Sequence, residues 1–178
     1  MIAVGKNVVL RRLSAADLDA FHSYRADPIV ARYQGWKAMS DTQALAFLNA
    51  MSEASMPNIG GWCQIGIADA DSNILIGDLG LHVAQDESEA ELGVTLSRAA
   101  QGQSRGFDAV RLAVSWVFSN TSVDKIVAIT DQRNAGAQAL LTRLGWPCVA
   151  TLGPEVEIKG VSELVFEHLR ADSLTKQE

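Results

Sequence analysis

The chain has 178 residues, a formal net charge of −6 at pH 7 and a sequence pI near 5.0. Hydrophobic residues make up 48% of it and charged residues 20%, a balance that suits one globular domain with a substantial core. The acidic balance argues against nucleic acid as the main partner, because phosphate backbones bind basic surfaces. No apolar run approaches membrane-spanning length and no signal peptide precedes the domain, so we expect a cytoplasmic protein without membrane contacts.

The first third of the chain predicts one strand and two helices. Residues 8–13 are typical of a short strand, and Ser14 suits a helix N-cap with Asp17 in the first turn. This helix should end near Pro28, because proline disfavours helical geometry in the residue before it. A second helix is expected over residues 40–54, where leucine and methionine recur at helical spacing.

The centre of the chain changes to strands. Residues 62–68, 74–83 and 90–96 are strand-like and are separated by turn-rich stretches, which predicts an antiparallel meander. A helix over 104–119 then precedes a compact buried strand over 125–130. Because that helix joins two strands, it predicts a crossover and hence one parallel pair.

The end of the chain predicts a helix over 134–144 and strands over 147–152 and 161–169. The fold class is therefore α/β with a mixed α+β sheet: about seven strands, mostly antiparallel with one parallel pair, flanked by four helices. We expect a single domain over residues 1–178, with a core over about 7–169 and a short polar C-terminal tail.

The cysteines and histidines do not predict a metal or nucleophile site. Cys63 and Cys148 lie outside any metal-ligand spacing, and we interpret both as small core residues of a protein in a reducing compartment. His22, His82 and His168 are scattered, so a surface or core role is favoured for each.

The stretch 98–107 is the most informative, because it follows a predicted strand and opens an amphipathic helix. Gly102, Ser104 and Gly106 allow the backbone to approach a ligand, and the N–H groups of a first helical turn point outward. A helix start of this kind suits a pyrophosphate group. The spacing matches neither a Walker P-loop nor a Rossmann fingerprint. Taken alone, such a loop is more often a tight connection.

This loop resembles the acetyl-CoA loop of the GNAT superfamily of N-acetyltransferases, whose pattern is Gln/Arg-x-x-Gly-x-Gly/Ala. Gln101, Ser104 and Gly106 occupy its fixed positions, and Ser104 replaces the first glycine, which is tolerable if its φ is negative. Residues 130–146 resemble the Arg-Asn-x-x-Ser…Leu-Gly-Phe signature of the RimJ/RimL-like branch, the ribosomal-protein N-terminal acetyltransferases. With further stretches near the N-terminus, the resemblance covers residues 7–169 in order.

The resemblance implies acetyl-CoA as cosubstrate, with no metal. It also implies that the strand ending at residue 96 lends main-chain groups to the pantetheine arm and splays from its parallel neighbour, where a main-chain N–H polarises the thioester carbonyl. The resemblance implies that Asn134 contacts the pantetheine, although a role as helix N-cap is alone enough to explain an asparagine at this position. The implied cofactor-binding residues are Val94, Thr95, Leu96, Gln101, Gly102, Gln103, Ser104, Arg105, Gly106, Phe107 and Asn134.

Acetyl transfer to an amine needs a group that takes the amine's proton, because an ammonium has no lone pair. We assign this role to Glu91, which lies three residues before Val94 on the central strand and matches a proposed base in several GNAT branches. The alternative is one more exposed acid, since Glu87, Glu89 and Glu91 form an acidic run.

The proton for the leaving thiolate has no obvious source. Many relatives use a tyrosine seven residues after the helix-starting asparagine, but that position here is Leu141, and the serine of the signature is Ala137. We therefore expect the thiolate to take its proton from solvent or from the amine itself.

Tyr33, Trp36 and Lys37 resemble acceptor-site wall residues of this branch, although aromatics in such a segment are just as often core. The predicted activity is N-acetylation of a primary amine, either a protein or peptide N-terminus or a small molecule. The acidic balance favours a cationic acceptor. A catalytically silent acyl-CoA-binding sensor or interaction domain is the alternative, and a homodimer stays open.

Overall fold

The computed structural model describes residues 1–37, 39–153 and 161–174. Its strands are β1 (Ala3–Val4), β2 (Val8–Arg12), β3 (Trp62–Asp69), β4 (Leu75–Val83), β5 (Ala90–Leu96), β6 (Lys125–Asp131), β7 (Cys148–Leu152) and β8 (Glu163–Leu169). Its helices are α1 (Leu18–Arg25), α2 (Pro28–Ala31), α3 (Asp41–Glu53), α4 (Arg105–Asn120), α5 (Ala135–Arg143) and α6 (Arg170–Leu174), with 3-10 turns at Ala15–Asp17 and Arg98–Ala100.

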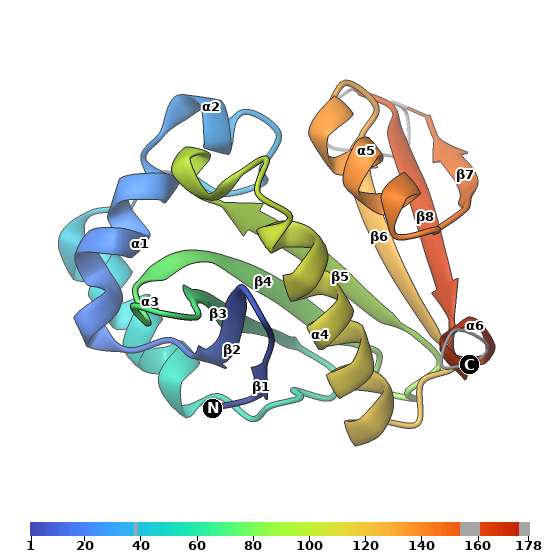
Figure 1. The fold of residues 1–178 in the computed structure, drawn as a ribbon, viewed down its shortest axis with the longest axis horizontal. Helices are drawn as coiled ribbons and strands as arrows, with labels where there is room; N and C mark the ends of the chain where they lie inside the picture. Colours follow the sequence, from blue (N-terminus) through green and yellow to red (C-terminus); the bar gives the residue numbers. More distant parts are fainter. Residues whose placement is uncertain (38, 154–160, 175–178) are drawn as a thin grey trace.

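Within the described residues the strands form one eight-stranded sheet in the order β1-β2-β3-β4-β5-β6-β8-β7 (Figure 1). Every neighbouring pair is antiparallel except β5 and β6, which α4 joins by a crossover. This confirms the predicted mixed sheet with one parallel pair. The sheet has eight strands rather than seven because the two-residue β1 pairs with β2 at its edge.

Two short helices were not expected from the sequence. Pro28 begins α2 directly after α1, since proline fits the first helical position and Asp27 caps the helix by accepting the N–H of Ile29 at 2.9 Å. The helix α6 occupies the start of the expected polar tail. The four predicted helices are present as α1, α3, α4 and α5.

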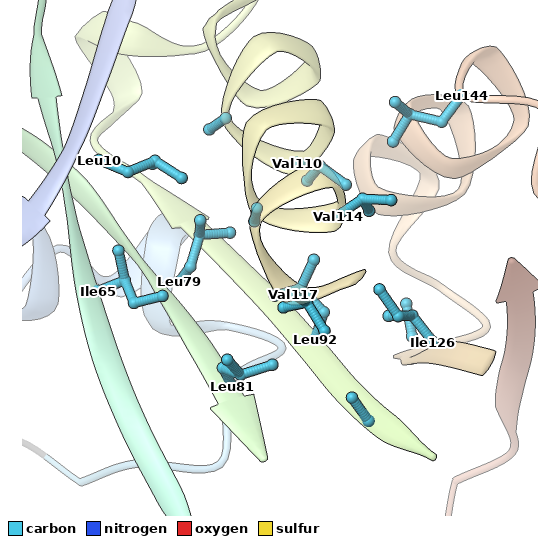
Figure 2. Packing of buried hydrophobic residues seen from close by; sticks show 14 of the residues in the cluster. Leu10, Ile65, Leu79, Leu81, Leu92, Val110, Val114, Val117, Ile126 and Leu144 are labelled. Atoms are coloured by element: carbon cyan, nitrogen blue, oxygen red, sulfur yellow. The ribbon is translucent and has the colours of Figure 1, made fainter. Parts of the chain in front are cut away.

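The helix α4 packs its apolar face on one side of the sheet. Figure 2 shows Val110, Val114 and Val117 of α4 facing the sheet. Leu92 of β5 and Ile126 of β6 belong to the same buried cluster. The helix therefore ties the two parallel strands together, and burial of each such side chain contributes about 1.5–3 kcal/mol.

The helices α1 and α3 lie on the opposite face. Alternate residues of a strand face opposite sides, so Asp78 faces away from α4 while its neighbour Leu79 packs in the α4 cluster. Asp78 meets Tyr24 and Arg25 of α1. A second apolar cluster around Phe21 fills the space between α1 and α3.

A buried ion pair anchors these helices to the sheet. The two Asp78 oxygens lie 3.0 and 2.9 Å from Arg25 Nη2, and Gln64 Nε2 and the Tyr24 hydroxyl also donate to this carboxylate. Burial and then the Asp78 charge raise the pKa of Tyr24, so its hydroxyl stays protonated and able to donate. The Arg25 guanidinium stacks 4.0 Å from the ring centroid of Trp36. The pair thus joins α1, β3, β4 and the segment after α2.

We predict that Asp78→Ala lowers the free energy of unfolding by about 3–5 kcal/mol, because it leaves the Arg25 charge buried without its partner. The melting temperature should fall by roughly 6–20 °C, measured by thermal unfolding followed by circular dichroism. The control is Asp71→Ala in the exposed β3–β4 turn, which should change stability by less than about 0.5 kcal/mol. Equal stability of the two variants would contradict the structural role of the pair.

Candidate functional site

The strands β5 and β6 are paired along a short part of their length. Two residue pairs join them, Ala90 with Ile126 and Glu91 with Val127. Beyond these the strands separate, β5 continuing to Leu96 and β6 to Asp131, as Figure 1 shows. The main-chain groups of β5 that face β6 beyond Glu91 therefore lack a strand partner, and they offer an edge to which an extended ligand can add.

A crevice of about 90 Å³ lies where the strands separate. Its walls come from Leu92, Gly93 and Val94 of β5, from residues 128–130 of β6 and from one face of α5. Tyr33 of the segment after α2 also lines it. The crevice thus joins the predicted cofactor strand to Tyr33, one of the three predicted acceptor-wall residues.

A larger hollow of about 560 Å³ lies elsewhere, beside Arg11 and Arg12. Arg11 is paired with Asp17 at 2.7 Å, and Arg12 donates to the carbonyl oxygens of Ser52 and Ala54 at 2.9 and 2.8 Å. Both cations are therefore engaged by the protein itself. We take the smaller crevice as the candidate functional site, because it adjoins the edge of β5 that β6 leaves unpaired.

The loop that leads into α4 leaves that helix start open. Asp108 is the first residue whose N–H joins the helical ladder, donating to Ser104 O at 3.0 Å, so the N–H groups of residues 105–107 precede the ladder. Ser104 is the N-cap residue, yet its side chain makes no cap hydrogen bond. The first turn therefore presents donors and the positive end of the helix dipole toward a ligand.

The conformation of Ser104 differs from the sequence expectation. Its φ is 60° and its ψ is 2°, in the left-handed region, whereas a negative φ was expected. The chain enters α4 through a left-handed residue, which is the reason that the family pattern has glycine there. Holding a serine in this region costs about 1–2 kcal/mol.

The remaining predicted loop residues shape the loop. The side-chain amides of Gln101 and Gln103 donate to Leu96 O at 3.0 Å and to Ala99 O at 2.8 Å, which ties the loop to the end of β5 and to the preceding turn. Gly102 has a φ of 71°, and a Cβ built on it would meet nothing within 4 Å. These contacts hold the backbone of the loop that leads into the uncapped first turn of α4.

Gly106 permits close packing under the loop. A Cβ at this position would lie 3.3 Å from Leu96 Cδ1 and 3.5 Å from Leu140 Cδ2. The glycine therefore lets the first turn of α4 approach β5 and α5. The space that it keeps clear lies toward these two leucines.

Two arginines of the loop are engaged in ion pairs. Arg98 Nε lies 2.5 Å from Asp27, and Arg105 Nη2 lies 2.6 Å from Asp69. The N–H of Ile29 and then Arg98 lower the pKa of Asp27, and Ser72 hydrogen bonds and then Arg105 lower the pKa of Asp69. Both carboxylates are charged at neutral pH, so both pairs persist.

Asn134 is the N-cap of α5. Its Oδ1 accepts the N–H of Ala137 at 3.2 Å, and the residue lines the crevice. Ala137 and Leu141 line it too, so the two positions where relatives carry hydroxyl groups are apolar here. The α5 wall of the crevice therefore supplies no proton donor from these positions.

Glu91 does not line the crevice itself, but it directly precedes Leu92 of the crevice wall. It is the last β5 residue paired with β6 and, by strand alternation, it faces the side opposite buried Leu92. His82 is its partner across the antiparallel β4–β5 ladder, and the ring of His82 lies 5.3 Å from that of Trp62. No role near Glu91 was expected for His82 from the sequence. The pairing of these two residues can nevertheless be found from the sequence, by counting residues outward along both strands from the turn that joins β4 to β5.

The other histidines lie elsewhere and have partners. His22 Nδ1 is 3.0 Å from an Asp41 oxygen, and His168 is buried against the Trp146 ring at a centroid distance of 5.4 Å. Among the described residues, no group of three or more His, Cys, Asp or Glu side chains could hold a metal ion. In the same residues, no helix combines the length and apolar character needed to span a bilayer.

The three predicted acceptor-wall residues are placed differently, and Lys37 is exposed and does not line the crevice. Tyr33 lines the crevice, and Arg32 lies over its ring at 5.3 Å. Trp36 is half-buried and stacks on Arg25, so it fixes the wall of this region.

The two cysteines differ in burial. Cys63 is buried, as expected, but Cys148 on β7 is exposed, so the expectation that both are core residues was wrong for Cys148.

Residues 7–146 match the family described as the acetyltransferase (GNAT) domain. The uncharacterized N-acetyltransferase p20 of Bacillus licheniformis is 24% identical over 157 residues, 87% of each chain. A GNAT-family acetyltransferase from Bacillus anthracis has a similar structure, with a TM-score of 0.82, 17% identity and coverage of 95% of this chain and 98% of that one. RimL, a ribosomal L7/L12 alpha-N-protein acetyltransferase solved with coenzyme A, has a TM-score of 0.80, 14% identity and coverage of 94% and 97%.

We predict that Gly106→Val lowers the free energy of unfolding by about 1–3 kcal/mol, because its side chain must displace Leu96 and Leu140. Gly102→Ala should cost about 1 kcal/mol from its positive φ alone, since the space around it is open. Urea denaturation measures both. Wild-type stability in Gly106→Val would contradict the packing described for the first turn of α4.

Proposed function

We propose, from the premise that this chain belongs to the GNAT acetyltransferase family, that it transfers an acetyl group from acetyl-CoA to a primary amine. The observation that carries the proposal is the crevice between β5 and β6, whose wall residue Leu140 lies beside Gly106 in the uncapped first turn of α4. The unpaired edge of β5 suits the pantetheine arm of coenzyme A, and the helix start that follows β5 along the chain suits its pyrophosphate.

The donor half of the site is supported by the chemistry of each part. Pantetheine carries amide groups that pair with a strand edge, and β5 beyond Glu91 offers such an edge. Val94, Thr95 and Leu96 supply it, and residues 101–107 present the helix start to the pyrophosphate. Asn134 at the α5 cap borders the same crevice. RimL, whose fold is similar, was solved with coenzyme A.

Direct attack is the mechanism that we propose. The amine nitrogen bonds to the acetyl carbonyl carbon, the carbon–sulfur bond breaks, and coenzyme A leaves as its thiol after taking a proton. Glu91 takes the amine's proton, directly or through one water. A main-chain N–H of β5 at the divergence polarises the carbonyl oxygen. With Ala137 and Leu141 in the crevice wall, the thiolate takes its proton from solvent or from the amine.

The acceptor approaches from the face that carries α1 and α2. Glu91 faces this side, and Tyr33 reaches the crevice from the segment after α2. Arg25 and Trp36 hold that segment against the sheet. We propose a protein or peptide N-terminus or a small amine as acceptor. Thiol release over an amine panel separates this enzyme from a silent acyl-CoA-binding module, which would bind the donor without turnover.

We predict that acetyl-CoA at a hundred times its Kd stabilises the protein by about 2.7 kcal/mol, which raises the melting temperature by roughly 5–10 °C. The shift should be the same in EDTA, because the proposed site needs no metal. Thermal melts with acetyl-CoA, and with inorganic phosphate as control, measure it. A protein whose melting does not respond to saturating acetyl-CoA would refute the proposed function.

We predict that Glu91→Gln lowers kcat near neutral pH by about a hundredfold to ten-thousandfold, because the amide cannot accept the proton. The deficit should shrink at high pH, where more of the amine is already neutral, and the Kd for acetyl-CoA should be unchanged. The matched control is Glu89→Gln in the same acidic run, where Glu89 is paired with Lys125 at 2.8 Å. Near-normal turnover of Glu91→Gln at neutral pH would return Glu91 to an ordinary strand acid.

A further inference from the structure

Arg143 reaches the phosphate loop from a distant element. It is the last residue of α5, and its Nη1 donates to the hydroxyl of Ser104 at 3.1 Å. Its guanidinium lies 4.5 Å from the centroid of the Phe107 ring in the first turn of α4. The cation is therefore held at the start of α4 by a hydrogen bond and a stacking contact.

The hydroxyl of Ser104 contacts Arg143 and does not cap its own helix. An N-cap serine normally accepts a hydrogen bond from the first helical turn, but this hydroxyl accepts from Arg143 and the backbone stays left-handed. The first-turn N–H groups are thereby left for a ligand. Ser104 thus orients a charged side chain beside the donors that it does not cap.

Arg143 differs from the other arginines of the loop in its partners. Arg98 and Arg105 are neutralised by Asp27 and Asp69. Among the ion pairs of the described residues none contains Arg143, whose contacts are a hydroxyl and a ring. A protein of net charge −6 that binds a polyanion needs a local positive charge, and Arg143 supplies one at the helix start.

We infer that Arg143 binds a phosphate group of coenzyme A, with Ser104 orienting its guanidinium. The inference rests on the proposed function, since coenzyme A is the donor assigned there. A guanidinium presents two parallel N–H groups to phosphate oxygens, and this pairing is stronger than one with a neutral donor. With one Nη1 hydrogen on Ser104 and one face on Phe107, Arg143 retains further N–H groups for the phosphate.

The test compares Arg143→Gln with Arg111→Gln, an exposed arginine of α4 that lies 5.8 Å from the same Phe107 ring. Calorimetric titration gives the Kd of each protein for acetyl-CoA, for its 3′-dephospho form and for S-acetylpantetheine, which has no phosphate. Arg143→Gln should raise the Kd for acetyl-CoA by about ten- to a hundredfold, the loss expected for a hydrogen bond to a charged group. Arg143→Lys should recover part of the affinity, and Arg111→Gln should bind as the wild type does.

Comparison of the three ligands identifies the phosphate group that Arg143 contacts. An equal loss with acetyl-CoA and its 3′-dephospho form assigns Arg143 to the pyrophosphate, and a loss with acetyl-CoA alone assigns it to the 3′-phosphate. A loss that extends equally to S-acetylpantetheine, or a Kd in Arg143→Gln that matches Arg111→Gln, would overturn the inference. Wild-type protein that binds no acetyl-CoA would instead refute the proposed function itself.

Discussion

The constraint on which the site depends is the interrupted pairing of β5 and β6. A strand edge without a neighbouring strand presents a row of N–H and C=O groups with which another extended segment can pair. Here two residue pairs hold the strands together and the rest of β5 faces a crevice. The crevice persists because α4 and its apolar cluster hold both strands at their paired end. Under the proposed function, the amide groups of pantetheine pair with this strand edge.

The second constraint on the proposed site is electrostatic. The chain is acidic overall, yet the proposed donor is a polyanion. The uncapped start of α4 supplies N–H donors without any side-chain charge, and the ion pairs of Arg98 and Arg105 leave these residues little net charge to offer. Ser104, the left-handed residue before α4, leaves the helix start uncapped, and its hydroxyl accepts a hydrogen bond from the cation Arg143. Backbone strain at this residue therefore accompanies an open binding loop.

Local patterns in the sequence predicted the helices α1, α3, α4 and α5, the strands of the mixed sheet other than the two-residue β1, and the loop before α4, because each depends on residues close together in the chain. Contacts between distant residues could not be predicted in this way. Arg25 and Asp78 are 53 positions apart, and Arg143 and Ser104 are 39 apart. The positive φ of Ser104 was also missed, because the helix entry that requires it is set by the packing of α4 on β5 and α5. The pairing of His82 with Glu91 was within reach, since the turn between their strands fixes the register.

The two halves of the site come from different parts of the chain, and this bears on how acceptor choice is encoded. The proposed donor half lies within residues 94–143, on β5, the loop, α4 and α5. The proposed acceptor half depends on the segment after α2, which the buried Arg25–Asp78 pair and the Trp36 stack hold against β4. Asp78 pairs across the ladder with Thr95, so the anchor of the acceptor segment adjoins the donor strand. Substitutions in residues 29–35, which leave out Asp27 with its ion pair to Arg98 and the Trp36 anchor, would therefore reshape the proposed acceptor wall with the least effect on the proposed donor half.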